Sequence, residues 1–124
     1  MSNRVLIVDD NQKFLAMLQE FLSEYEGIEV VGAAASAQEA LGLIDDTRPQ
    51  VLIIDLWMPD MSGLELTHFV KSRWPRLTTV VLTLFDSPHH RKAAFDAGAD
   101  AFVGKARMDS ELVPAIQYAV AKAV

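Results

Sequence analysis

The stretch Ile53-Ile54-Asp55-Leu56-Trp57 places a single carboxylate directly after an apolar run that begins at Val51. A second apolar run, Val5-Leu6-Ile7-Val8, is also followed by acids, Asp9 and Asp10. Continuous apolar runs of this length are typical of strands that are buried on both faces of a parallel sheet. Open parallel sheets bind ligands at the edge formed by the carboxyl ends of their strands. The two runs therefore predict three carboxylates at one sheet edge.

Composition bounds the class of protein. The chain has 124 residues, of which 51% are hydrophobic and 23% charged, and this predicts one globular domain over residues 1–124. The net charge of −6 argues against nonspecific nucleic-acid binding, which needs a basic surface. Cysteine is absent, which excludes disulfides and thiolate metal sites. We expect a cytoplasmic protein with no membrane contact, because no signal peptide or membrane-spanning run is found.

Strands and helices alternate along the whole chain. The predicted strands cover residues 4–8, 28–33, 51–54, 79–84 and 101–103. The predicted helices lie between and after them, at about 11–26, 37–46, 64–74, 88–97 and from 109 or 110 onward. Five βα units predict a doubly wound (βα)5, flavodoxin-like α/β fold, a three-layer sandwich with parallel strand order 2-1-3-4-5.

Several helix ends carry recognisable signals. Ser36 is followed three residues later by Glu39, which is the pattern of a capping box. Ser87 is followed by Pro88, as in a helix with an N-cap and proline at its first position. Gly27 is the expected end of the first helix. Asp109 or Ser110 is the expected cap of the last helix.

Five side chains from strand ends converge at one edge in this strand order. Asp9 and Asp10 end the first strand, Asp55 ends the third, Thr83 lies late in the fourth, and Lys105 follows the fifth. Carboxylate oxygens suit Mg²⁺, which keeps several waters and favours phosphate. Asp55 is a candidate nucleophile toward phosphorus, because a carboxylate can form an acyl phosphate. Mg²⁺ and Lys105 could neutralise a phosphoryl group, and the Thr83 hydroxyl could donate a hydrogen bond to it.

The motifs that carry these residues resemble the CheY-like receiver domains of response regulators in two-component signalling. The matching pieces are Val-Asp-Asp at 8–10, Asp-Leu-Trp-Met-Pro-Asp-Met-Ser-Gly at 55–63, Leu-Thr at 82–83, Gly-Ala-Asp-Ala-Phe at 98–102, and Lys105. They occur in the family's order over essentially the whole chain. The segments 81–86 and 98–105 also resemble the branch whose receivers precede a LuxR/NarL-type helix-turn-helix.

The resemblance implies a signalling switch and not an enzyme, although receivers catalyse their own phosphotransfer and autodephosphorylation. By position, Asp55 is the phosphoacceptor, supplied by a sensor histidine kinase or a phosphotransfer protein. Asp9, Asp10 and Asp55, with the backbone carbonyl of Trp57, would hold Mg²⁺. Lys105 would contact the phosphoryl group.

The resemblance also implies an output mechanism. Thr83 and Phe102 form the switch pair: Thr83 would move toward the phosphoryl oxygens and Phe102 would swing inward. The surface of the fourth helix, fifth strand and fifth helix would report the change, and a homodimer is allowed. The sequence ends with the last predicted helix, so we expect no direct nucleic-acid binding by this chain. Whether it is a single-domain regulator or a receiver without its effector stays open.

Two departures from the family pattern bear on the site. Ala106 follows Lys105 where the family usually has proline, often after a cis bond. A cis bond before a non-proline residue costs about 3 kcal/mol, so we expect a trans bond or a strained loop. Leu84 is large for its position, and with Trp57 and Phe85 it is expected to crowd the site and restrict attacking water.

Other classes of function fit less well. A haloacid-dehalogenase-type phosphatase needs a second acid two residues after the nucleophile, where this chain has Trp57. A flavodoxin-type electron carrier needs a Ser/Thr/Gly-rich loop after the first strand, which here is acidic. Asp60 is interpreted as a loop residue, and the three histidines have no zinc-ligand spacing. The remaining alternative is a pseudo-receiver, an unphosphorylated interaction module with the same fold, for which Ala106 is the one supporting feature.

Overall fold

The computed structural model describes residues 2–123 and contains a five-stranded parallel sheet. The strands are β1 (Asn3–Val8), β2 (Ile28–Ala34), β3 (Val51–Ile54), β4 (Thr78–Thr83) and β5 (Ala101–Gly104). Their order is β2-β1-β3-β4-β5, and every neighbouring pair is parallel. The predicted fold class and strand order are confirmed.

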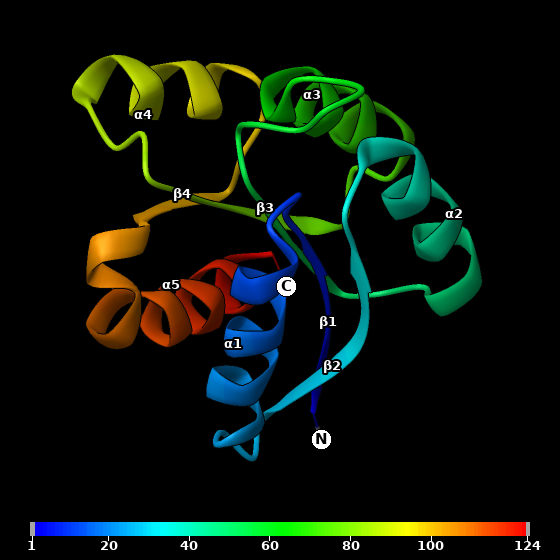
Figure 1. Cartoon of the computed structure of the whole chain (residues 1–124), viewed down its shortest axis with the longest axis vertical. Helices are drawn as coiled ribbons and strands as arrows, with labels where there is room; N and C mark the ends of the chain where they lie inside the picture. The colour runs from blue at the N-terminus through cyan, green and yellow to red at the C-terminus, as the bar shows by residue number, and fades with distance from the viewer. Residues whose placement is uncertain (1, 124) are drawn as a thin grey trace.

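Helices cover both faces of this sheet and complete the three layers (Figure 1). They are α1 (Gln12–Ser23), α2 (Ala37–Thr47), α3 (Gly63–Arg73), α4 (Pro88–Asp96) and α5 (Met108–Lys122), with a 3₁₀ turn, η1 (Lys105–Arg107), before α5. Helices α1 and α5 pack on one face, whereas α2, α3 and α4 pack on the other. No helix within residues 2–123 is long and apolar enough to cross a membrane.

The side chains of alternating strand residues pack into two separate apolar cores, one on each face of the sheet. In β3, Leu52 and Ile54 face the core beneath α2 and α3, while Val51 and Ile53 face the core beneath α1 and α5. All residues of β3 and β4 are buried. This two-sided burial explains why the strand sequences are continuous apolar runs and not alternating ones. It also fixes Asp55, the first residue after β3, at the carboxyl edge of the sheet.

Polar caps begin most of the helices, and two of these caps, Ser36 and Ser87, are the ones that the sequence predicts. The side chains of Asn11, Ser36, Ser62 and Ser87 each accept a hydrogen bond from the backbone N–H three residues later. Glu39 completes the predicted capping box, because its Oε1 accepts from the N–H of Ala35.

The predicted boundaries are wrong at several places. Helix α5 has neither Asp109 nor Ser110 as its cap: it begins at Met108, because η1 leads directly into it. Both residues lie in the first turn, where the charge of Asp109 suits the positive end of the helix. Helix α1 ends at Ser23, before Gly27, and β4 ends at Thr83, so that Leu84 lies beyond the strand.

A tight loop joins β3 to α3. The N–H of Gly63 donates to the carbonyl of Leu56 at 2.7 Å. A Cβ atom at position 63 would lie 2.1 Å from the carbonyl oxygen of Asp55, so only glycine fits this close approach. Gly63 therefore lets the start of α3 pack directly against the backbone that carries Asp55.

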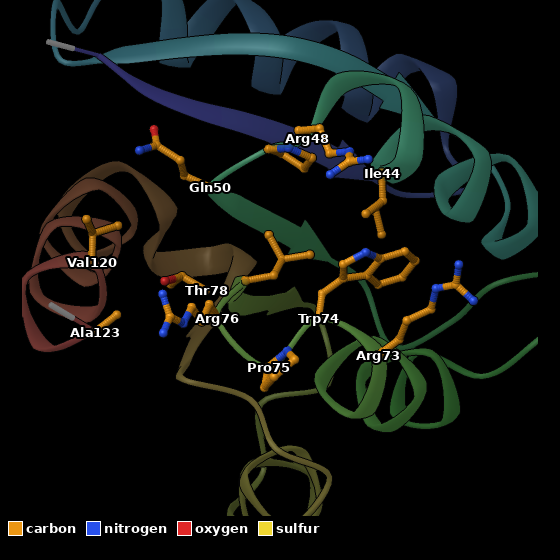
Figure 2. Close-up of a pocket in the computed structure, with 12 residues that line it drawn as sticks. Ile44, Arg48, Gln50, Arg73, Trp74, Pro75, Arg76, Thr78, Val120 and Ala123 are labelled. Atoms are coloured by element: carbon orange, nitrogen blue, oxygen red, sulfur yellow. The ribbon is translucent and has the colours of Figure 1, made fainter.

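A groove of about 560 Å³ lies at the amino edge of the sheet, away from the strand ends that carry the acids. Figure 2 shows Trp74 inside it, with Arg48, Arg73 and Arg76 around the ring. Arg48 caps the end of α2 and Arg73 ends α3. Cations at these positions offset the negative ends of the helix dipoles. Arg48 and Arg73 thus have a structural role, and the groove is separate from the candidate site.

Candidate functional site

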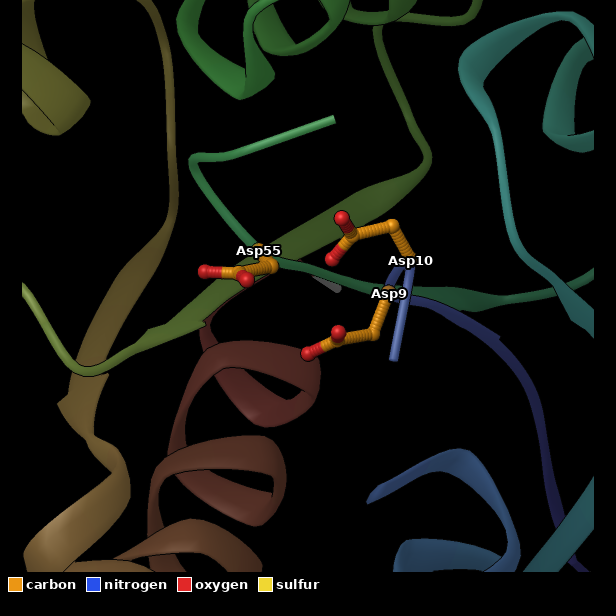
Figure 3. A group of neighbouring side chains, drawn as sticks. All are labelled: Asp9, Asp10 and Asp55. Carbon is orange, nitrogen blue, oxygen red and sulfur yellow. The ribbon is translucent and has the colours of Figure 1, made fainter. Parts of the chain in front are cut away.

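Three carboxylates meet at the carboxyl edge of the sheet. Asp9 and Asp10 follow β1, Asp55 follows the neighbouring β3, and each offers an oxygen within 4.8 Å of the other two. Figure 3 shows the three side chains gathered at the ends of these strands. Asp9 and Asp55 are buried, whereas Asp10 is exposed. The structure thus brings together the three acids that the sequence places at this edge.

Lys105 lies against this cluster. Its Nζ is 2.7 Å from Oδ2 of Asp9 and 3.6 Å from Oδ2 of Asp55. No peptide bond within residues 2–123 is cis, so the bond before Ala106 is trans. Lys105 opens the turn η1 and still reaches the acids, although proline does not follow it. The loop after β5 therefore places the ammonium where the sequence predicts it.

Backbone groups orient both buried carboxylates. Oδ1 of Asp9 accepts from the N–H of Asn11 at 2.9 Å, and Oδ1 of Asp55 accepts from the N–H of Leu56 at 2.8 Å. In each case the other oxygen, Oδ2, faces Lys105. One oxygen of each acid is thus held by the chain, and the second points toward the shared space of the site.

Burial raises the pKa of Asp55 above its ordinary value of 3.8. A hydrogen bond from the Thr83 side chain and the charge of Lys105 lower that pKa, while the charge of Asp9 raises it further. The net direction is upward, so ionised Asp55 is held in the folded protein at a cost. A bound cation would reduce this cost.

The donor set fits Mg²⁺. All the side-chain donors are oxygens, three negative charges are close together, and one of the three acids is exposed to water. Mg²⁺ prefers a few carboxylates and retains several waters, which suits a cluster that is open on one side. The three acids are the side chains that could hold such an ion.

Thr83 and Phe102 lie on the adjacent strands β4 and β5. Thr83 is fully buried, and its Oγ1 accepts from the N–H of Phe85 at 3.2 Å. The ring of Phe102 is 5% exposed and belongs to the core beneath α2 and α3. The guanidinium of Arg91, from α4, lies 5.5 Å from the centroid of that ring. Phe102 therefore faces inward in this structure, beneath α4.

Trp57 and Phe85 form a surface pair beside the site, with ring centroids 5.8 Å apart. Both are exposed, and Leu84 is more so, at 73%. The expectation that Leu84 crowds the site is wrong, because the chain has left β4 at this residue and its side chain faces solvent. Any shielding of Asp55 falls to the two aromatic rings.

Two contacts were not foreseen from the sequence. Asp60 accepts hydrogen bonds from the N–H groups of Ala37 and Gln38, which keep its pKa below the ordinary value, so this loop residue helps to begin α2. The Nζ of Lys105 lies 3.9 Å from the ring centroid of Phe14, in α1. Neither pairing has a local sequence signal, because the partners lie far apart along the chain.

A parallel five-stranded sheet with three acids and a lysine at its carboxyl edge is the arrangement that the resemblance to receiver domains predicts. The family profile described as "Response regulator receiver domain" matches residues 5–117. The chain belongs to this family and is a receiver domain of a two-component response regulator.

Similar proteins point to one branch of the family. The response regulator protein VraR of Staphylococcus epidermidis is 33% identical over 117 residues, covering 94% of this chain and 56% of VraR. The chain thus spans about half the length of the curated relatives it matches. A LuxR-family response regulator from Aurantimonas has a TM-score of 0.93 at 29% identity, covering 98% of this chain and 87% of that one. The receiver domain of the putative response regulator NarL from Mycobacterium tuberculosis has a TM-score of 0.89 at 28% identity, with 97% of both chains covered.

Proposed function

We propose that this chain is a phosphorylation-dependent switch that accepts a phosphoryl group on Asp55 from a sensor histidine kinase or a phosphotransfer protein. The observation that carries the proposal is the placement of Lys105 near two buried acids, Asp9 after β1 and Asp55 after β3. Such a site holds one reactive carboxylate and, beside it, an ammonium group that can neutralise part of the charge of a phosphoryl group.

The reaction needs only the groups already described. A carboxylate oxygen of Asp55 attacks the phosphorus of a phosphohistidine; an O–P bond forms and the P–N bond breaks, and the histidine nitrogen leaves with the electron pair. Lys105 can donate to a phosphoryl oxygen because its ammonium has three N–H groups. Mg²⁺, bound by Asp9, Asp10 and Asp55 with the carbonyl of Trp57, would supply further positive charge for the phosphoryl oxygens.

The same site can be coupled to an output through Thr83 and Phe102. A phosphoryl group on Asp55 offers new acceptors to the hydroxyl of Thr83, the last residue of the neighbouring strand β4. Movement of Thr83 would favour the inward position of Phe102 beneath α4. Phosphorylation shifts the population only if the phosphoryl group binds this arrangement better than the alternative. The surface formed by α4, β5 and α5 then reports the shift.

The similarity to LuxR-family regulators suggests a transcriptional output in the cytoplasm. In that case DNA would be contacted by a region outside these residues, and the receiver would act through dimerisation. The receiver itself works as a switch that turns over its own phosphoryl group and not as an enzyme acting on a separate substrate.

Intact mass spectrometry tests the proposal. After incubation with Mg²⁺ and a small acyl phosphate such as acetyl phosphate, the protein should gain the mass of one phosphoryl group. The gain should be absent in Asp55→Asn and without Mg²⁺. A folded wild-type protein that gains no phosphoryl group under these conditions would refute the proposal and support the pseudo-receiver instead.

A further inference from the structure

The ammonium of Lys105 has an aromatic neighbour as well as acidic ones. Its Nζ lies 2.7 Å from Asp9, 3.6 Å from Asp55 and 3.9 Å from the ring centroid of Phe14. A cation over a ring face at this distance is attracted by the negative charge density of the ring. The Lys105 side chain is only 11% exposed, and this attraction is stronger where water is partly excluded.

Phe14 is held in place by the same segment that carries Asp9. The N–H of Phe14 donates to Oδ1 of Asn11 at 3.0 Å, and the N–H of Asn11 donates to Oδ1 of Asp9 at 2.9 Å. Asn11 thereby fixes the first turn of α1 relative to the acid. Lys105 thus contacts one short, hydrogen-bonded unit twice, through the carboxylate of Asp9 and the ring of Phe14.

The backbone around Lys105 gives the side chain little help. It opens the short turn η1, which has no side-chain cap, and the next residue is Ala106, which does not restrict the backbone as proline would. A lysine side chain has four rotatable bonds and is among the side chains that lose the most conformational entropy when they are fixed. A second contact, in addition to the one with Asp9, would therefore help to hold the ammonium in one position.

We propose that Phe14 is a positioning residue, which holds the Lys105 ammonium at the site through its ring face. This inference deepens the proposed function and rests on it. The ring offers no lone pair and accepts N–H groups only weakly, so it competes little with a phosphoryl oxygen. After one N–H of Lys105 is given to Asp9, two remain for incoming oxygens. The ring thus restricts the ammonium without blocking it.

The kinetic test compares Phe14→Leu with wild type. Leucine preserves apolar packing against the core beneath α1 but removes the ring face. The rate of phosphoryl uptake from acetyl phosphate should fall by roughly 2- to 30-fold, the range expected for loss of one cation–π contact. Phe14→Tyr should restore the rate. Phe21→Leu is the matched control, since Phe21 is also a half-buried ring of α1 but pairs with Tyr25. A general packing effect would slow both leucine variants.

A second measurement tests the position directly and needs no phosphorylation. In ¹H–¹³C spectra the Lys105 methylene protons next to Nζ should be shifted upfield by the ring, and this shift should disappear in Phe14→Leu. In a Lys105→Met background the Phe14→Leu substitution should no longer change the rate. Unshifted methylene signals, or equal uptake rates for Phe14→Leu and wild type, would overturn the positioning role. If the wild type takes up no phosphoryl group, the proposed function fails, and the spectra still decide the contact.

Discussion

Replacing Asp55 with asparagine should stabilise the protein when Mg²⁺ is absent. Asparagine has nearly the same shape, and its carbonyl can still accept the hydrogen bond from the N–H of Leu56. What disappears is one negative charge in a cluster of three. The substitution therefore isolates the electrostatic cost of holding an ionised Asp55 at this edge.

The distances give the size of the effect. At an effective dielectric constant near 20, charges on Asp55 and Asp9, within 4.8 Å, repel by about 3.5 kcal/mol, whereas the exposed Asp10 is screened by water and adds little. The attraction between Asp55 and Lys105, whose charged atoms lie 3.6 Å apart, contributes about 4.5 kcal/mol in the favourable direction. These charge terms nearly cancel, so the expected net cost of about 2 kcal/mol comes from burial, which is the main cause of the raised pKa of Asp55. The variant should unfold at a temperature higher by roughly 6 °C, for a chain of this size.

Urea unfolding at neutral pH in the presence of a chelator measures the difference directly. Saturating Mg²⁺ should stabilise the wild type more than the variant and so narrow or reverse the difference in stability, because the proposed ion site is the three-acid cluster of the folded state. A variant that is equally stable or less stable than wild type in the chelator would refute this electrostatic account.

The contribution of Asp55 to the stability of the folded protein changes with pH in a defined direction. The folded-state pKa of Asp55 is raised above its ordinary value of 3.8, so the folded protein holds this proton more tightly than the unfolded chain does. Stability from this group is therefore present below pH 3.8 and is lost as the pH rises through the folded-state pKa. The advantage of Asp55→Asn should grow over that window and then level off. An advantage that is constant with pH would contradict the assignment of the effect to this carboxylate.

Three further outcomes are expected. Gly63→Ala should destabilise the protein by more than about 3 kcal/mol in urea unfolding, because its Cβ meets the Asp55 backbone, whereas Gly42→Ala, in open space within α2, should stabilise it by up to about 1 kcal/mol. Lys105→Met should cost about 3 kcal/mol in the same assay without Mg²⁺, because it leaves buried negative charge unpaired; a neutral effect would show that water screens the cluster. Replacing Trp57 and Phe85 together with small polar residues should speed loss of the phosphoryl group, followed by mass spectrometry over time, and an unchanged decay rate would remove their shielding role.

The strand pattern and the positions of the acids could be predicted because each depends on local sequence. A strand buried on both faces has to be apolar throughout, so Val51 to Ile54 identify β3 without reference to any partner. The first polar residue after such a strand has to lie at the sheet edge, which places Asp55. The N-caps at Ser36 and Ser87 are local for the same reason, since each bonds to a backbone group three residues away.

The errors and omissions arise where structure depends on distant partners or on backbone geometry without a sequence signal. The start of α5 is set by the main-chain turn η1, which needs no capping side chain, so the polar residues at 109 and 110 gave a false boundary. Asp60 caps α2 from a loop that follows β3, and only the folded chain brings the two together. Leu84 is exposed because β4 ends one residue before it, at Thr83.

Lys105 is not followed by proline, but its side chain contacts Asp9 and Phe14. From the sequence, Ala106 weakens the case for a working site, since the loop that carries the lysine is less restricted. In the folded chain the side chain of Lys105 is restricted by its surroundings instead, by a carboxylate on one side and an aromatic ring on the other. A lysine held in this way reaches Asp55 with two N–H donors available, which a phosphoacceptor site needs and an unphosphorylated interaction module does not. The placement of this side chain therefore favours the phosphorylated switch over the pseudo-receiver.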